Sequence, residues 1–137
     1  MYYLINTLVF NYGGEIMDFN NAFPIYVQIM DMIKRKIVVN ELKAGEKLPS
    51  VRDIAQELKV NPNTIQRSYS ELEREEIVFS QRGLGTFVTQ DLEKIKYLKE
   101  SIASTFVEKF IRDMESLEYN KVEIIKLLNI KMEGYNE

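Results

Sequence analysis

The sequence predicts a mainly α-helical protein with one small β-hairpin. Apolar residues recur three or four positions apart in several stretches, which is the spacing of one face of a helix. Two short runs rich in β-branched and aromatic residues flank the turn Arg82–Gly85, a pattern typical of a hairpin. Pro, Ser and Asn residues stand where one stretch gives way to the next, as residues that begin helices do.

Composition excludes several classes of function. The 137 residues are 45% hydrophobic, which suits one ordinary domain with a small appendage. There is no Cys and no His, so a thiol nucleophile, a Ser-His-Asp triad and a His/Cys metal site are excluded. No Walker-type or GxGxxG loop is present, and no apolar run approaches the roughly 20 residues of a membrane span. We therefore expect a cytoplasmic protein that is not an enzyme and uses no cofactor, metal or membrane.

Residues 1–22 are predicted to form an N-terminal arm, because their aromatic and apolar residues follow no clean period. The stretch Gly13–Met17 can be back-translated into a purine-rich ribosome-binding sequence directly before an initiator codon. The alternative is that the natural protein begins at Met17 and that residues 1–16 do not belong to it. Mass spectrometry of the native protein distinguishes the two.

Three helices are predicted within residues 23–90. The first covers 24–40, begins near Pro24 and carries a broad apolar stripe. Pro49 then favours an extended link, after which Ser50 caps a second, short helix.

The third helix is predicted over 62–76. Asn61 is a good capping residue, and Pro62 fits the first helical position because its missing N–H costs nothing there. An apolar face is formed by Ile65, Tyr69 and Leu72. The polar side chains of the first two turns lie away from that face and are those of Asn63, Thr64, Gln66 and Arg67.

Helix, extended link, helix, tight turn, helix and hairpin, in this order, describe a winged helix-turn-helix. In this architecture the third helix enters the major groove of DNA and the second crosses the backbone. The first turn of the third helix also offers backbone N–H groups to phosphate. The candidate DNA contacts on the helices and at the hairpin tip are Arg52, Asn61, Asn63, Thr64, Gln66, Arg67, Arg82 and Gly83.

Candidates on the third helix each have a structural alternative. Asn61 suits a helix cap better than a base contact. Asn63 and Gln66 are either solvated or directed at base edges, where adenine is the natural partner of an amide. Arg67 either pairs with Glu71 one turn later or contacts phosphate or guanine.

Candidates outside the third helix are all cationic or next to a cation. Arg52 either pairs with a nearby acid or contacts phosphate, and Lys59 is either a solvated charge or part of the same surface. Arg82 beside Gly83 is either an ordinary turn or a phosphate or minor-groove contact. The net charge is −3, yet the stretch 59–70 holds two bases and no acid, so a locally basic face is expected.

Residues 91–137 are predicted to form a two-helix tail. An apolar stripe at helical spacing runs through 91–118, Asn120 interrupts it, and a shorter helix follows. Because two helices alone bury little apolar surface, we expect a dimer interface rather than an intramolecular core. The predicted interface residues are Leu98, Ile102, Phe106, Phe110 and Met114.

The segment "LPSVRDIAQELKVNPNTIQRSYSELEREEIVFSQRGLGTFV" resembles the DNA-binding domain of the GntR family of bacterial transcription regulators. The resemblance covers residues 24–88, and its most specific elements are Leu48-Pro49-Ser50-x-Arg52, Asn61-Pro62-Asn63-Thr64 and Arg82-Gly83-x-Gly85-Thr86-Phe87-Val88. The NPNT form and the short tail are most similar to the YtrA subfamily. The resemblance implies family DNA contacts at the eight candidate residues and a dimer formed by the tail.

Two departures from the family pattern stand out. Many members have Gly where this sequence has Lys59, and a left-handed backbone there would cost about 1 kcal/mol. The tail is also too short, and lacks the His residues, for the larger metal-binding effector domains of other branches.

The sequence therefore predicts a dimeric, sequence-specific DNA-binding regulator that reads an inverted repeat. Repression by occlusion of a promoter is the simplest mechanism, although activation stays open. The alternative is a winged helix that acts as a protein-interaction or assembly module without DNA, which the net acidity would suit. No motif identifies the operator, the regulated genes or a small-molecule effector.

Overall fold

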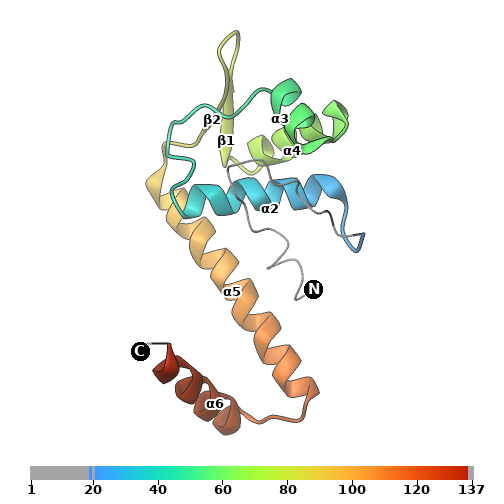
Figure 1. The fold of residues 1–137 in the computed structure, drawn as a ribbon. Coiled ribbons are helices and arrows are strands. Elements are labelled where there is room, and N and C mark those ends of the chain that lie inside the picture. Colours follow the sequence, from blue (N-terminus) through green and yellow to red (C-terminus); the bar gives the residue numbers. More distant parts are fainter. Residues whose placement is uncertain (1–18, 20, 136–137) are drawn as a thin grey trace. The chain divides into compact units, whose positions relative to one another are not determined.

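The computed structural model describes residue 19 and residues 21–135, and helices and strands are labelled as in Figure 1. The proposed start at Met17 and most of the predicted N-terminal arm lie outside these residues. The chain divides into two compact units, Met1–Leu98 and Lys99–Glu137, and each is considered by itself below. No helix of the described part has the length and apolar character required to cross a membrane.

The described part of the first unit contains three complete helices, and the predicted caps begin two of them. Helix α2 spans Ile25–Val38, α3 spans Val51–Leu58 and α4 spans Pro62–Arg74. At the start of α3, Oγ of Ser50 accepts a hydrogen bond of 3.0 Å from the Asp53 N–H. At the start of α4, Oδ1 of Asn61 accepts a hydrogen bond of 2.8 Å from the Asn63 N–H. Both residues therefore cap their helices as predicted.

The core of the first unit lies among these helices and the base of the hairpin. Helix α4 packs against both α2 and α3, and its predicted apolar face is buried. The largest fully buried apolar side chains are those of Ile29, Ile33, Ile65, Leu72, Val78 and Val88. Among the described residues, two polar side chains share this interior, and both are hydrogen-bonded: Gln28 Nε2 donates to the carbonyl of Phe23 at 2.8 Å, and Ser68 is described below.

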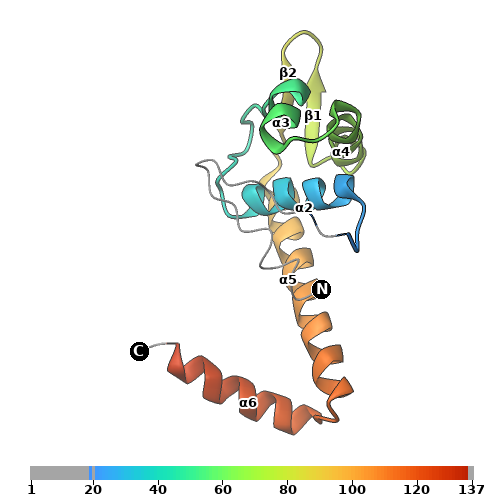
Figure 2. The ribbon, with the colours of Figure 1, turned by 45° about the vertical axis from the view of Figure 1, so that its right-hand side comes forward.

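Strands β1 (Val78–Gln81) and β2 (Gly85–Val88) form the predicted hairpin. They pair antiparallel, with Val78 opposite Val88 and Phe79 opposite Phe87, and the two Phe rings stack with centroids 5.6 Å apart. In Figures 1 and 2 the hairpin extends past α3 and α4 as a wing.

The link before α3 pairs with the hairpin, which its sequence did not predict. The Leu48 N–H donates to the carbonyl of Thr86 at 2.8 Å, and Lys47 forms an isolated antiparallel bridge with Phe87. The Tyr69 hydroxyl then ties the link to α4 by donating to the carbonyl of Pro49 at 2.7 Å. The hairpin, the link and α4 are thus joined by direct hydrogen bonds.

Four helices of the described chain end with a residue in the left-handed region that is not glycine. The φ angles are 65° at Asn40, 55° at Lys59, 61° at Glu76 and 63° at Glu118. Asn tolerates this conformation better than residues with longer side chains. Lys59 therefore has the left-handed backbone for which we expected a cost of about 1 kcal/mol.

The second unit consists of the greater part of α5 (Leu92–Ser116) followed by α6 (Lys121–Gly134). The predicted interruption at Asn120 is the N-cap of α6, where Asn120 and Glu123 form a reciprocal capping box. Helix α5 ends two residues earlier than the predicted stripe. The first turns of α5 belong to the first unit, where Ile95 and Leu98 pack against its core.

Candidate nucleic-acid interface

The N-terminal half of α4 has a buried back and an exposed polar front. Ile65 and Ser68 are completely buried, whereas Asn63, Gln66 and Arg67 are exposed. Thr64 is half-buried at the edge between the two faces. The exposure of Asn63, Gln66 and Arg67 agrees with the predicted polar face, whereas Thr64 is only partly exposed.

The cap at Asn61 changes what the first turn of α4 can offer to DNA. Pro62 has no N–H, the Asn63 N–H is bonded to the Asn61 side chain, and the Thr64 N–H donates to the Asn61 carbonyl at 2.9 Å. These groups already have partners in the free protein, so a phosphate that contacted them would have to share or replace an existing hydrogen bond. The physical reason is that a side-chain cap supplies the acceptor that a phosphate would otherwise provide.

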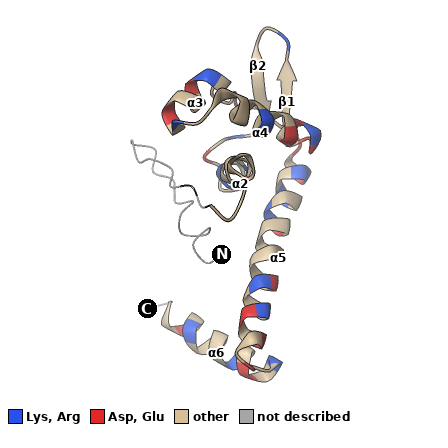
Figure 3. Cartoon of the chain, turned by 90° about the vertical axis from the view of Figure 1, so that its right-hand side faces the viewer, with Lys and Arg blue, Asp and Glu red and all other residues tan. Residues whose placement is uncertain are grey.

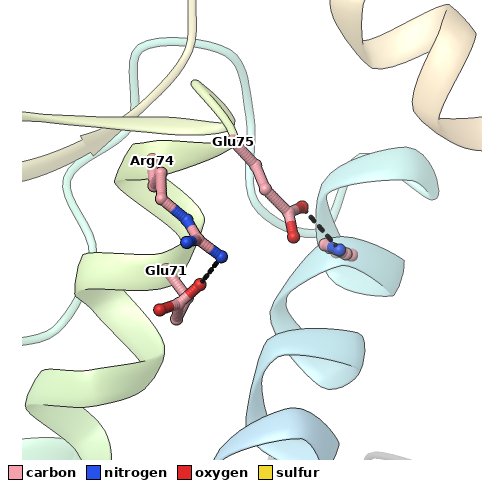
Figure 4. Close-up of polar contacts among 4 residues, drawn as sticks. Glu71, Arg74 and Glu75 are labelled. Atoms are coloured by element: carbon pink, nitrogen blue, oxygen red, sulfur yellow. Dashed lines mark hydrogen bonds and ion pairs between the residues drawn. The ribbon is translucent and has the colours of Figure 1, made fainter.

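Arg67 contacts an aromatic ring rather than the predicted alternative partner, Glu71. Its guanidinium carbon lies 3.7 Å from the centroid of the Tyr26 ring on α2. Glu71 instead pairs with Arg74, which lies one turn further along α4 (Figure 4). The positive charge of Arg67 is therefore not neutralised by an acid of the described chain.

Two further polar side chains of α4, Gln66 and Ser68, form hydrogen bonds within the protein. Nε2 of Gln66 donates to Oγ of Ser70 at 3.3 Å, and both residues are exposed. The buried Ser68 hydroxyl lies 3.0 Å from the carbonyl oxygen of Tyr26 and 3.1 Å from that of Thr64. Ser68 thereby links α4 to the backbone of α2.

The remaining predicted cations are exposed on the same unit. Arg52 lies in the first turn of α3, and Arg82 lies with Gly83 at the tip of the hairpin, where the ribbon is otherwise uncharged (Figure 3). Within the described residues, no ion pair is formed by any of the four candidate cations, Arg52, Lys59, Arg67 and Arg82. Gly83 has φ 78°, and a Cβ there would meet open space.

Lys47 is a candidate that sequence reasoning missed. It is exposed and runs beside β2, where a Cβ built on Gly85 would lie only 2.7 Å from its Cε. Gly85 has φ 123°, so its backbone conformation favours glycine there. No local pattern signals this contact, because Lys47 and Gly85 are brought together by the pairing of the link with the wing.

Acids at the C-terminal end of α4 are engaged by neighbouring groups. Glu75 pairs with Lys34 of α2 at 2.7 Å (Figure 4). The two carboxylate oxygens of Glu73 accept from the N–H and hydroxyl of Ser80 on β1, at 3.1 and 3.2 Å. The acidic end of α4 is therefore linked to α2 by an ion pair and to β1 of the hairpin by hydrogen bonds.

Burial shifts the pKa of three ionisable groups of α2. Desolvation raises the pKa of Asp31 above its ordinary value of 3.8, although Lys34 and Arg35 act in the opposite direction. Desolvation also lowers the pKa of Arg35 and of Lys36. No cluster of three or more potential metal ligands occurs in the part of the chain that the structure describes.

The predicted dimer residues fall in both units. Leu98 packs against the core of the first unit, whereas the other four lie in the second. Phe106 and Phe110 are each 38% exposed, and Ile102 and Met114 are half-buried.

The fold is a winged helix-turn-helix whose third helix presents an exposed polar row, and the cations around this row have no acidic partners among the described residues. These features are typical of a DNA-binding transcription regulator. The family model for bacterial regulatory proteins of the gntR family matches residues 25–88. The chain belongs to the GntR family and is one of its DNA-binding transcriptional regulators, a class of proteins that are not enzymes.

Comparison with known proteins gives the same answer along most of the chain. The sequence is 44% identical over 117 residues to the HTH-type transcriptional regulator YhcF of Bacillus subtilis, covering 85% of this chain and 97% of that protein. It is 35% identical over 98 residues to the transcriptional repressor YtrA of the same organism, covering 67% and 75% of the two chains. A GntR-family regulator from Listeria monocytogenes has a similar structure, with a TM-score of 0.76 and 44% identity over 81% of this chain and 97% of its own. None of these supports a winged helix that serves only protein interaction.

Proposed function

We propose that the chain is a cytoplasmic, dimeric repressor that binds an inverted-repeat operator and occludes a promoter. The observation that carries the proposal is the exposed polar row on α4, held by a fully buried apolar back. A rigid helix of this kind fits the major groove, which is about 12 Å wide. The similarity to YtrA, which is named a transcriptional repressor, supports repression.

Each exposed side chain takes a distinct role in the proposed complex. Asn63, Gln66 and Arg67 contact base edges, since amides suit adenine and a guanidinium suits guanine. Thr64 contributes at the edge of the row, and Asn61 sets the position of the helix by capping it. Phosphate contacts come from the cations around the row and from the wing tip, namely Arg52, Lys59, Lys47, Arg82 and the backbone at Gly83.

The second unit is proposed to form the dimer. Its 39 residues contain a single buried apolar side chain among those described, that of Ile124, which is 8% exposed. Several large apolar side chains stay exposed, including Val122 at 74% and Ile125 at 48%. Two helices with so little interior require a partner surface, and a second copy supplies the same stripe through a two-fold axis. The interface comprises Ile102, Phe106, Phe110 and Met114, with Leu98 at its margin.

These roles correspond to a division of labour along the chain. Residues 23–90 bind DNA, and residues 91–137 hold two copies together, which sets the distance between the two recognition helices. Half-sites about one helical turn apart, near 34 Å, follow from this arrangement. The proposal includes no cofactor and assigns no effector.

Selection of duplexes from a random-sequence library by the purified protein tests the proposal. An inverted repeat should emerge, and binding to it should weaken as salt rises. Arg67→Ala should then lose about 1–3 kcal/mol of binding free energy, with relaxed preference at one base pair of each half-site. Arg112→Ala, a change of the same kind on α5, serves as the control and should leave affinity unchanged. Selection of no sequence, or of a site without two-fold symmetry, contradicts the proposal.

A further inference from the structure

Tyr26 stands outside the helix-turn-helix motif, yet its ring lies against the recognition helix. It belongs to the first turn of α2, and it packs partly against the core of the first unit. The guanidinium carbon of Arg67 lies 3.7 Å from the centre of its ring, which is the close face contact of a cation–π pair. The two residues are 41 positions apart, so no local sequence pattern indicates the contact.

The backbone of Tyr26 is fixed to α4 through Ser68, the residue that follows Arg67. The Ser68 hydroxyl, which is completely buried, lies 3.0 Å from the Tyr26 carbonyl oxygen. The backbone that carries the ring is therefore held against the backbone that carries Arg67. A rigid support of this kind removes rotamer freedom from a long side chain before DNA arrives.

The ring contact leaves the donors of Arg67 available. A guanidinium is planar, and its five N–H groups lie in that plane, so a ring against one face does not occupy them. The acid that could have captured these donors, Glu71, is paired with Arg74. An open hollow of about 440 Å³ lies directly beside the pair and is lined by Ile25, Tyr26, Asn63, Thr64 and Arg67.

We infer that Tyr26 is a positioning residue for DNA recognition: its ring holds the Arg67 guanidinium with its edge directed at the operator. The inference rests on the proposed role of Arg67 in base contact. It assigns part of the sequence specificity to α2, a helix that itself need not touch a base. The ring face carries this role, and the phenol hydroxyl does not.

Binding of the full-length protein to a fluorescent duplex selected from a random library tests the inference. Tyr26→Leu keeps an apolar body against the core but removes the ring, and should weaken binding roughly two- to five-fold, as a cation–π contact at an exposed site predicts. Tyr26→Phe keeps the ring face and should bind like wild type. Tyr97→Leu, a change of the same kind at an exposed tyrosine of α5, should have no effect.

A double-mutant cycle separates positioning from a merely structural effect. In the Arg67→Ala background, Tyr26→Leu should cause no further loss of affinity. Tyr26→Leu should also relax preference at the same base pair as Arg67→Ala, measured with duplexes substituted at each position. Independent, additive losses would overturn the inference, and so would tighter binding by Tyr26→Leu, because the ring would then sequester Arg67.

Failure of the inference is distinguishable from failure of the proposed function. A wild-type protein that selects no sequence overturns both. A wild-type protein that selects an operator, and an Arg67→Ala variant that loses affinity while Tyr26→Leu does not, overturns the positioning role alone.

Discussion

Replacement of Lys59 by glycine should stabilise the protein. Lys59 follows the last residue of α3 with φ 55° and ψ 46°, in the left-handed region. A side chain in that region costs roughly 1–2 kcal/mol, whereas glycine avoids the clash but loses roughly 0.5–1 kcal/mol through its freer unfolded chain. The net gain expected for Lys59→Gly is therefore about 0.5–1 kcal/mol. A domain of roughly 60–100 residues shifts by about 4–8 °C per kcal/mol, so Tm should rise by about 2–8 °C.

Chemical unfolding followed by circular dichroism measures this effect, at one fixed protein concentration because dimerisation shifts apparent stability. Lys59→Ala is the matched control, since it removes the same charge but keeps a Cβ in the left-handed conformation. Only the glycine variant should gain stability. Equal stabilities of the two variants would refute the backbone explanation. Glu76→Gly, at φ 61° after α4, provides a second site at which the same gain is expected.

Three further outcomes are expected. Phe106→Glu should dissociate the dimer in light scattering, whereas Glu100→Lys should not; a Phe106→Glu dimer would place the interface elsewhere. Glu73→Ala should lower the free energy of unfolding by about 0.5–1.5 kcal/mol, because its carboxylate accepts two hydrogen bonds from the wing; Glu57→Ala is its control, and equal values for the two would exclude a brace. Burial raises the folded-state pKa of Asp31, so its contribution to stability falls as pH rises from 3.8 through that raised pKa. Asp31→Asn should therefore stabilise the protein near pH 7 in urea unfolding, by an amount that shrinks as pH falls toward 3.8, and a constant gain would contradict the titration.

Local chemistry made much of the fold predictable. Ser50 and Asn61 cap helices because a short polar side chain meets N–H groups only two or three residues away. The buried back of α4 follows from the helical spacing of its apolar residues, and the hairpin follows from two β-prone runs around a glycine turn. In each case the residues that determine the structure are close neighbours in the chain.

Contacts between distant segments were not predictable in the same way. The sequence offered Glu71 as a partner for Arg67, but Glu71 is equally well spaced for Arg74, and the folded chain pairs Glu71 with Arg74. The ring that Arg67 meets instead comes from α2, and its position depends on how α2 packs against α4. Lys47 became a candidate only because its link pairs with the wing. Periodicity indicates which face is buried and carries no information about which partner covers it.

The arrangement of charge along α4 explains how a chain of net charge −3 can present a cationic surface to DNA. Arg67 and Glu75 are eight positions apart, which corresponds to about 12 Å along a helix rising 1.5 Å per residue. The Debye length at physiological salt is about 8 Å, so the acids at the far end of α4 contribute little where the first turns meet DNA. Glu75 is also neutralised locally by Lys34. Glu71 lies only about 6 Å along the helix from Arg67, within the Debye length, but it is paired with Arg74. The potential that DNA meets is therefore set by the cations nearest the first turns of α4, and the same acids that lower the net charge hold the recognition helix in place.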